Sequence, residues 1–334
     1  MRVIWYRWSA RWKQAPWSGP FWRDERGERA GDLARWGAAR GRPPGLHRAG
    51  QRPVLRLSRG SPTARIPGEP GSVSLTLSPR RMEMPFVETP HARMFYTVSG
   101  RQGKALMLIH GAGGNHLHWP APLRRLPGTR VYAIDLPGHG RSSGPGRTAI
   151  EDYAADVVGF LDGVGLDRAI LVGHSMGGAI AQTVALRYPE RVAGLVLVGT
   201  GARLRVSPLL LDGILQNFQG VLELMADWAW GPGTPSERVE RGRRMMARVD
   251  PQVLWGDFAA CDRFDIRDQV GQIGVPTLII TGSEDRMTPP KFARWLEEQI
   301  PQARLVLVEG AGHMVMLEKP EGIAALVREW LEAL

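Results

Sequence analysis

The sequence predicts an α/β fold in which a mostly parallel sheet is covered by helices on both faces. From residue 94 onward, short apolar runs alternate with helical patterns, which is typical of parallel strands joined by helices. Most of the runs are continuously apolar, as strands buried on both faces must be. The expected strands are Met94–Val98, Ala105–Ile109, Val131–Ile134, Ala169–Val172, Gly194–Val198, Thr277–Thr281 and Arg304–Val308.

The segments between these runs carry the helical pattern. In Ile150–Gly163, apolar residues recur at positions 150, 153, 154, 157, 158 and 161, which form one face of a helix. Further helices are expected at Gly178–Tyr188, Lys291–Gln299 and Glu321–Leu334, the first of them ending before a proline.

One long segment interrupts the alternation of strands and helices. Between Gly199 and Val275 the sequence has no good strand, and the helical patterns Pro208–Trp230, Ser236–Val249 and Gln252–Ala260 follow one another. An insertion of about 70 residues is too long for an ordinary loop. We therefore expect a helical lid at about residues 201–272, inserted before the strand Thr277–Thr281.

The net charge of +10 is unevenly distributed along the 334 residues. Residues 1–81 hold 17 basic and five acidic side chains, a net charge of +12, whereas residues 82–334 hold 26 basic and 28 acidic ones, a net charge of −2. A strongly basic protein ordinarily suggests nucleic acid or an anionic membrane as a partner. Because the excess lies outside the patterned part of the chain, we expect neither partner for that part.

Residues 1–84 are rich in Arg, Gly, Pro and Trp and show no clear period. We interpret them as a disordered segment or as a stretch upstream of the true start, with Met82 and Met84 as candidate starts. A targeting peptide and a nucleic-acid-binding arm are the alternatives. A secretory signal needs an apolar region, which these residues lack, and the acidic residues at positions 24–32 are unusual for a transit peptide. Residues 85–334 are expected to form the single folded domain.

Two further features narrow the class of protein. The sequence has no apolar run of about 18 residues, so it predicts no membrane-spanning helix. Its single cysteine, Cys261, excludes a disulfide framework and a cysteine-rich metal site. We expect a cytoplasmic protein, and the oligomeric state stays open.

The pentapeptide Gly173–Gly177 lies between the predicted strand Ala169–Val172 and the helix that follows it. Its sequence, Gly-His-Ser-Met-Gly, matches a nucleophile elbow, in which a sharp turn lifts a serine above the edge of the sheet. The residues two before and two after the serine crowd one another, which favours glycine at both positions. Ser175 is therefore the candidate nucleophile.

A serine nucleophile needs a general base, and the base needs an acid that orients it. His313 follows the last predicted strand, which places it at the same sheet edge as Ser175. Asp285 follows the preceding strand and is the best candidate for the acid, with Glu284 next. Asp135 is a rival at another strand end, but the tight loop after it suggests that its carboxylate caps backbone amides.

Other histidines have simpler interpretations. Three of them lie in glycine-rich turns, where a structural hydrogen bond is expected: His110, His139 and His174. Two more could line the mouth of a pocket: His116 and His118.

The developing negative charge of an acyl-transfer reaction needs hydrogen-bond donors. The loop His110–Gly114 follows the strand Ala105–Ile109, so the backbone N–H of Ala112 can point into the site, paired with that of Met176. Large apolar residues of the lid and of the segment after this loop are candidate walls of a substrate pocket, with ordinary helix packing as the alternative for each. They are Trp119, Phe218, Leu222, Met225, Trp228, Trp230, Trp255 and Phe258.

Together these motifs resemble the α/β-hydrolase superfamily, and within it the lid-bearing esterases. The matching segments, within about Pro85 to Leu334, are His110–Gly114, Asp135–Ser142, Gly173–Gly177, Gly282–Asp285 and Gly310–His313. The resemblance implies an eight-stranded sheet whose second strand is antiparallel. It also implies hydrolysis of small apolar carboxylic esters through a Ser175–His313–Asp285 triad and an acyl-enzyme, with neither a metal nor a cofactor.

The superfamily is functionally broad, and two positions narrow it. Haloalkane dehalogenases and epoxide hydrolases use an aspartate where this chain has Ser175, and carbon–carbon bond hydrolases usually carry tryptophan at the position of Met314. Lactonase, thioesterase, carbon–carbon hydrolase and cofactor-free perhydrolase activities stay open, because they use the same triad. A ligand-binding receptor of the same fold is the alternative from another class.

Overall fold

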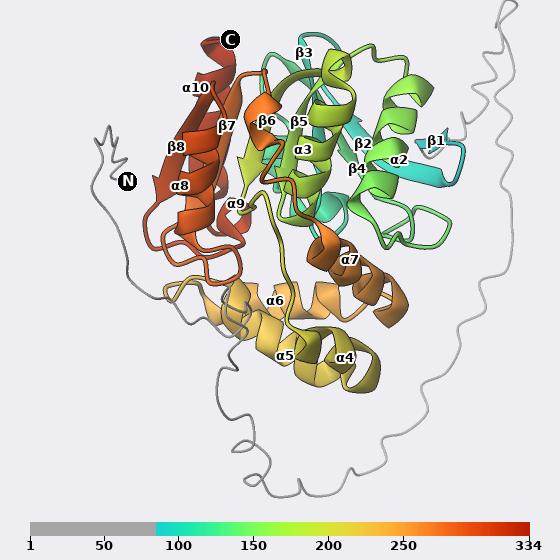
Figure 1. The fold of residues 1–334 in the computed structure, drawn as a ribbon, viewed down its shortest axis with the longest axis vertical. Helices are drawn as coiled ribbons and strands as arrows, with labels where there is room; N and C mark the ends of the chain where they lie inside the picture. The colour runs from blue at the N-terminus through green and yellow to red at the C-terminus, as the bar shows by residue number, and fades with distance from the viewer. Residues whose placement is uncertain (1–84) are drawn as a thin grey trace, which may run out of the picture. The chain divides into compact units, whose positions relative to one another are not determined.

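The structure is a computed structural model that describes residues 85–334, so the expectation for residues 1–84 lies outside the described residues. It contains one eight-stranded sheet with the strand order β1-β2-β4-β3-β5-β6-β7-β8 (Figure 1). Strand β2 is antiparallel to both of its neighbours, and the other pairs are parallel. The strands are β1 (Phe86–Glu88), β2 (Arg93–Ser99), β3 (Lys104–Ile109), β4 (Thr129–Ile134), β5 (Ala169–His174), β6 (Val192–Val198), β7 (Thr277–Gly282) and β8 (Ala303–Val308).

The sheet confirms the seven predicted strands and adds one that the sequence did not reveal. Strand β1 spans only three residues and pairs with β2 through Val87 opposite Met94. Such a short edge strand has too few residues to show a period of two, because the pattern needs about four residues to be visible.

Central strands are buried because each of their faces packs against helices. Every residue of β5 is buried. Along β3, Met107 and Ile109 belong to one core cluster, which we call the first core, while Leu106 and Leu108 belong to the second core. The alternation of side chains in a strand requires this division. The continuous apolar runs in the sequence are therefore explained by two cores, one on each side of the sheet.

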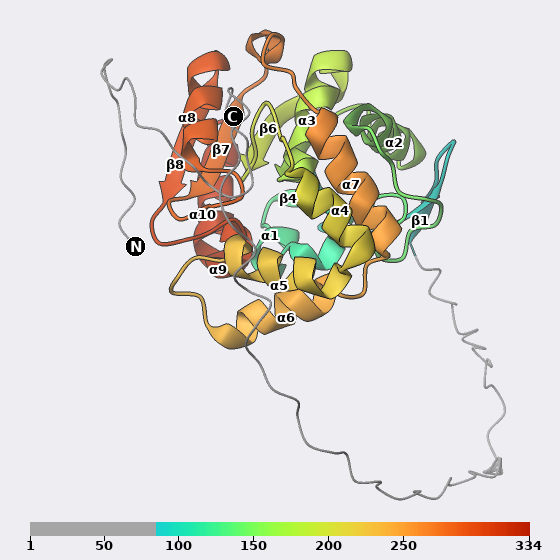
Figure 2. The same cartoon turned by 60° about the horizontal axis from the view of Figure 1, so that its bottom comes forward.

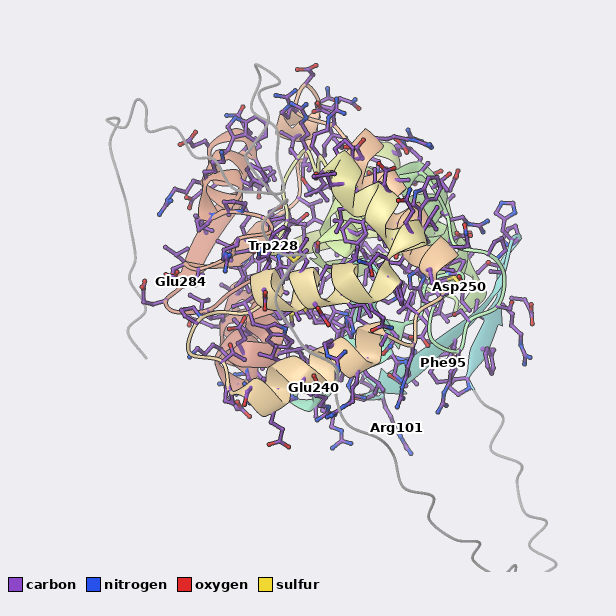
Figure 3. The ribbon with its side chains drawn as sticks, turned by 90° about the horizontal axis from the view of Figure 1, so that it is seen from below. Phe95, Arg101, Trp228, Glu240, Asp250 and Glu284 are labelled. Atoms are coloured by element: carbon purple, nitrogen blue, oxygen red, sulfur yellow. The ribbon has the colours of Figure 1, made fainter. Side chains whose placement is uncertain are left out.

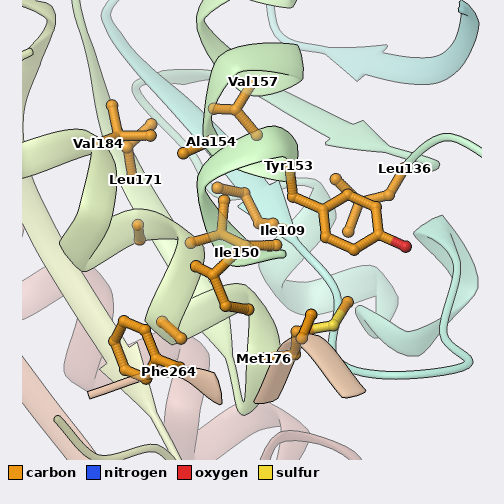
Figure 4. Close-up of a cluster of buried hydrophobic side chains, with 14 of the residues drawn as sticks. Ile109, Leu136, Ile150, Tyr153, Ala154, Val157, Leu171, Met176, Val184 and Phe264 are labelled. Carbon is orange, nitrogen blue, oxygen red and sulfur yellow. The ribbon is translucent and has the colours of Figure 1, made fainter. Parts of the chain in front are cut away.

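Two groups of helices complete the cores. The first core receives α2 (Ile150–Gly163), α3 (Met176–Arg187) and α8 (Pro290–Gln299), and the second receives α1 (Ala121–Arg124) and α10 (Pro320–Glu332). Figure 4 shows Ile150, Tyr153 and Val157 of α2 directed toward Ile109 and Leu171 of the sheet. Helix α9 (Val315–Glu318) also lies outside the insertion, with 3-10 turns η1 (His116–His118), η2 (Pro189–Arg191) and η3 (Val270–Gln272). Within residues 85–334, no helix has the length and apolar character needed to cross a membrane.

Four helices lie between β6 and β7, and we call residues 208–263 the cap. They are α4 (Pro208–Gln216), α5 (Phe218–Ala229), α6 (Ser236–Met246) and α7 (Pro251–Arg263). Figures 1 and 2 show them gathered at one end of the sheet, and Figure 3 views that end, with Trp228 on α5 and Glu240 on α6. The helical pattern Pro208–Trp230, read as continuous from the sequence, is divided at Asn217, whose side chain accepts the N–H of Gly220 and so begins a new helix.

Candidate active site

Ser175 lies at the turn between β5 and α3. Its backbone has φ 52° and ψ −117°, and it is the only non-glycine residue among residues 85–334 with a positive φ. Holding a non-glycine residue in such a sparsely populated backbone conformation costs about 1–3 kcal/mol of stability, so the surrounding structure must enforce it. The Ser175 N–H donates to the carbonyl of Val198 at 2.9 Å, which ties the turn to the end of β6.

Close backbone contacts explain the glycines on either side of Ser175. A Cβ atom on Gly173 would lie 2.2 Å from the carbonyl oxygen of Gly177, and a Cβ on Gly177 would lie 2.2 Å from that of Ile109. Both distances are far below van der Waals contact. The strand and the helix can meet this closely only without side chains, which confirms the reason that the sequence pattern suggested.

His313 and Asp285 form a buried pair close to this turn. The Nδ1 atom of His313 lies 3.0 Å from Oδ2 and 3.2 Å from Oδ1 of Asp285. The carboxylate also accepts the backbone N–H groups of Met287 and Thr288, at 2.9 and 2.8 Å, and the Thr288 hydroxyl at 2.8 Å. These bonds fix the carboxylate and leave the Nε2 side of the imidazole for another partner.

Asp135, the rival carboxylate, caps the loop that follows it. It accepts the backbone N–H groups of His116 at 2.6 Å and of Arg141 at 2.9 Å, together with a ring nitrogen of His116 at 2.8 Å. The expectation that Asp135 serves backbone amides is confirmed.

The strand ends bring these groups to one edge of the sheet. A Cβ on Gly199, at the end of β6, would lie 3.3 Å from both Asp285 Oδ2 and His313 Nδ1. A Cβ on Gly111, after β3, would lie 3.1 Å from the Cβ of Ser175. The glycines after β3 and β6 therefore leave room for the serine on one side and for the His–Asp pair on the other.

The loop after β3 forms a tight turn. The N–H of Gly114 donates to the carbonyl of Gly111 at 3.0 Å, and Gly113 has φ +61°, the pattern of a type II turn. Within residues 85–334, the N–H of Ala112 makes no hydrogen bond. The N–H of Met176, the first residue of α3, has no intrahelical partner either.

A small pocket lies beside Ser175. Its volume is about 30 Å³, and since one water molecule needs about 10–15 Å³ of such volume, the pocket could hold about two. The residues that line it are Ser175, Leu204, Val206, Phe258, Cys261, Met287 and Thr288.

Most of the described chain matches a known protein family. The model of a family described as "Alpha/beta hydrolase family" matches residues 106–326. The chain belongs to the alpha/beta hydrolase family. It is 32% identical to the pimeloyl-[acyl-carrier protein] methyl ester esterase of Neisseria meningitidis over 244 residues, which cover 69% of this chain and 94% of that protein.

Two other similar proteins indicate the range of activities around this alpha/beta hydrolase. A 2-hydroxy-6-oxononadienedioate/2-hydroxy-6-oxononatrienedioate hydrolase of Burkholderia vietnamiensis is 32% identical over 264 residues, 72% of this chain and 91% of that one. The solved structure of a thermophilic esterase is 37% identical and superposes with a TM-score of 0.66, covering 75% of this chain and 97% of that one. The chain is therefore a hydrolase related to esterases.

Of the eight residues predicted to form the pocket walls, only Phe258 lines the pocket. Trp119 is fully buried in the second core, beside Leu123 of α1, because the chain turns into α1 directly after it. The predicted cap residues other than Phe258 lie outside the pocket lining, and four of them, Phe218, Met225, Trp228 and Trp255, pack within or against the first core. The other two, Leu222 and Trp230, are buried without belonging to either cluster. Packing, the alternative stated for each, is correct for those that lie in or against a core.

Leu204, Val206, Met287 and Thr288 line the pocket although the sequence patterns did not single them out. Leu204 and Val206 follow β6 in an irregular segment, and Thr288 stands three residues after Asp285. Their position in segments that follow strands, at the sheet edge where Ser175 lies, was the one signal in the sequence that could have identified them as pocket residues. Helical periodicity, which selected the cap residues, gives no information about such segments.

The histidines of the glycine-rich turns make the structural hydrogen bonds expected of them. His110 Nε2 accepts the N–H of Leu136 at 3.1 Å, and its Nδ1 lies 2.8 Å from the carbonyl of Gly111. His174 Nε2 lies 3.1 Å from the carbonyl of His313, which supports the loop that carries the candidate base. Burial lowers the pKa of both His110 and His174 well below 6.5, so both rings are neutral.

We predict that Gly173→Ala lowers the free energy of unfolding by at least about 3 kcal/mol, because the new Cβ collides with a backbone carbonyl that cannot move. Gly274→Ala is the matched control, since a Cβ there meets nothing within 4 Å, and its effect should stay within about 1 kcal/mol. Chemical denaturation of the purified variants measures both. A Gly173→Ala protein as stable as the control would contradict this account of the turn.

His118 gives a second prediction, on stability against pH. It is buried rather than at a pocket mouth, and burial, reinforced by the nearby charge of His139, lowers its pKa from 6.5 to about 4. Because the pKa of His118 is lower in the folded protein than its ordinary value of 6.5, its full contribution to stability is present above pH 6.5. That stability is lost as the pH falls from 6.5 toward 4. The expected loss from this residue is about 3 kcal/mol.

Denaturant unfolding of the wild type and of His118→Gln, at a series of pH values from about 7 to about 4, measures this loss. The variant should lose about 3 kcal/mol less than the wild type over that range. Parallel curves for the two proteins would show that His118 does not carry the effect.

Proposed function

We propose that this alpha/beta hydrolase is a serine esterase that cleaves small apolar carboxylic esters. The observation that carries the proposal is the strained Ser175 at the turn between β5 and α3, beside a buried His313–Asp285 pair. A backbone held at φ 52° for a serine is costly, and such strain concentrates at functional sites. Similarity to two esterases, at 32% and 37% identity, supports the same assignment.

In the proposed mechanism, the Oγ of Ser175 attacks the ester carbonyl while His313 takes its proton on Nε2. The bond to the alcohol then breaks, and His313 donates that proton to the departing alkoxide oxygen. A water molecule, deprotonated by His313, attacks the acyl-enzyme and releases the acid and the free serine. Asp285 holds the imidazole in the required tautomer and stabilises its positive charge.

Ala112 and Met176 are the proposed oxyanion donors. Each has a backbone N–H without a partner in its own turn or helix: Ala112 lies in the turn after β3, and Met176 begins α3 directly after Ser175. Losing one such donor typically slows acyl transfer a hundredfold or more.

The pocket supports a small, uncharged substrate group. Leu204, Val206, Phe258 and Met287 give it apolar walls, and its volume is about 30 Å³. Its lining residues include no lysine or arginine. The relative from Burkholderia vietnamiensis acts on a dicarboxylate by its name, and a dianion would be poorly matched to such a lining.

A carbon–carbon bond hydrolase is the second candidate, because that relative is as similar to this chain as the methyl ester esterase is. A panel of short-chain esters, lactones, thioesters and a ring-cleavage dicarboxylate separates the candidates. The ester proposal expects kcat/KM to be highest for short neutral esters. A higher kcat/KM for the dicarboxylate would replace it.

We predict that Ser175→Ala reduces turnover of a short-chain p-nitrophenyl ester to background, because no other group replaces the nucleophile. Circular dichroism and the melting temperature should stay close to those of the wild type or improve slightly, since alanine removes only the hydroxyl. Residual activity above a few per cent would show that the esterase activity comes from another group.

The two carboxylates give a matched pair of variants. Asp285→Asn should lower kcat by about 10⁴-fold, because the amide stabilises the wrong imidazole tautomer. Asp135→Asn should mainly lower the melting temperature, since it weakens the cap on the N–H groups of His116 and Arg141. If Asp135→Asn loses activity while Asp285→Asn keeps it, the acid is assigned to the wrong residue.

A further inference from the structure

Asp257, on helix α7 of the cap, contacts three separate elements of the domain. Its side chain is fully buried. Oδ2 accepts the backbone N–H of Gly113 at 2.8 Å and lies 2.8 Å from Nε2 of His139, while Oδ1 accepts the Tyr153 hydroxyl at 2.6 Å. One carboxylate of the cap thus connects the turn after β3, the loop after β4 and helix α2.

The surroundings of His139 show which charge state the pair has. Its Nε2 faces the Asp257 carboxylate, and its Nδ1 lies 3.0 Å from the carbonyl of Pro137. The Pro137 carbonyl can only accept, so Nδ1 carries a proton, and a second proton on Nε2, donated to the Asp257 carboxylate, makes the ring an imidazolium. Burial opposes this charge, but the charge and hydrogen bond of Asp257 outweigh it and raise the pKa of His139.

His110, whose ring centroid lies 4.8 Å from that of His139, is consistent with this assignment. Its Nε2 accepts the N–H of Leu136, which requires a neutral ring. Burial and the neighbouring His139 charge both lower its pKa. The pair of His139 and Asp257 is therefore a buried ion pair beside the candidate oxyanion loop.

We propose that Asp257 is a positioning residue for the oxyanion hole: through the Gly113 N–H, it fixes the turn that presents the Ala112 N–H to the substrate. The inference rests on the proposed esterase function. Type I and type II turns differ by a rotation of the central peptide, and glycine at Gly113 permits both. Rotating the Ala112–Gly113 peptide would replace the Gly113 N–H that faces the Asp257 carboxylate by the carbonyl oxygen of Ala112. The buried anion would repel that oxygen, so it selects the type II turn.

Other cap residues reinforce this selection by shape. A Cβ on Gly113 would lie 2.4 Å from Sδ of Met246 and 2.8 Å from Cδ1 of Leu254. The cap therefore packs directly on the turn as well as binding its N–H. The geometry of the oxyanion loop then depends on the position of α6 and α7, and the cap acts in catalysis as well as in substrate binding.

The test uses Asp257→Asn in the full chain, because asparagine keeps the size of the side chain and removes its charge. We expect kcat to fall at least tenfold while KM changes less than twofold. A trifluoromethyl ketone inhibitor reports on the hole itself: the Ser175 oxygen adds to its carbonyl carbon, the hydroxyl proton passes to His313, and the carbonyl oxygen becomes an oxyanion. Its Ki should rise by the same factor as kcat falls.

Two control variants separate positioning from general stability. Asp156→Asn removes a buried carboxylate that pairs with Arg147 at 2.8 and 3.0 Å and does not touch the loop, so kcat and the ketone Ki should stay within twofold. Tyr153→Phe removes one donor to Asp257 and keeps the bond to Gly113, so kcat should fall less than threefold.

Wild-type kcat and ketone affinity in Asp257→Asn would overturn the inference. If that variant does not fold, His139→Gln decides instead, because it removes the positive partner and keeps the carboxylate. A kcat loss and a rise in the ketone Ki of at least fivefold would then support the inference, and any smaller effect would overturn it. A wild-type chain that neither cleaves esters nor reacts with a fluorophosphonate at Ser175 refutes the proposed function itself.

Discussion

The close approach of β5 and α3 at Ser175 is the constraint on which the rest of the site depends. Gly173 and Gly177 lie so near each other and the Ile109 carbonyl that neither has room for a Cβ. This contact forces Ser175 into its positive φ and raises it at the carboxyl edge of the sheet. Since the serine is fixed by backbone packing, every other functional group has to be brought to it.

Strand order determines how each group arrives. Strand β5 has β3 on one side and β6 on the other, followed by β7 and β8, so the proposed acid and base come from strands that do not pair with β5. The loops of Asp285 and His313 must cross the end of β6, and Gly199 there leaves room for them. His174, next to the serine, then holds the carbonyl of His313. A parallel sheet thus assembles from distant parts of the chain a site that no single segment contains.

The sequence predicted those parts that short-range patterns determine. Helix α2 has the bounds read from its periodicity, and the elbow glycines have the contacts that their spacing implied. Trp119 was placed wrongly, because an aromatic residue after a functional loop can turn into the core as readily as into a pocket. Asp257 was not identified at all: nothing within its helix distinguishes it, and its partners lie 104 to 144 residues away in sequence.

Buried carboxylates link the cap to both loops of the candidate site. Asp257 holds the turn after β3, while Glu318 of α9 accepts the N–H groups of Gly231 in the cap and Gly312 beside the candidate base, both at 3.0 Å. A Cβ on Gly312 would lie 2.4 Å from the Gly231 nitrogen, so cap and loop are in direct backbone contact. An unpaired buried carboxylate is costly, so a displacement of the cap that breaks these bonds is opposed by electrostatics as well as by lost packing. The cap therefore stabilises the same arrangement of loops that the proposed chemistry requires.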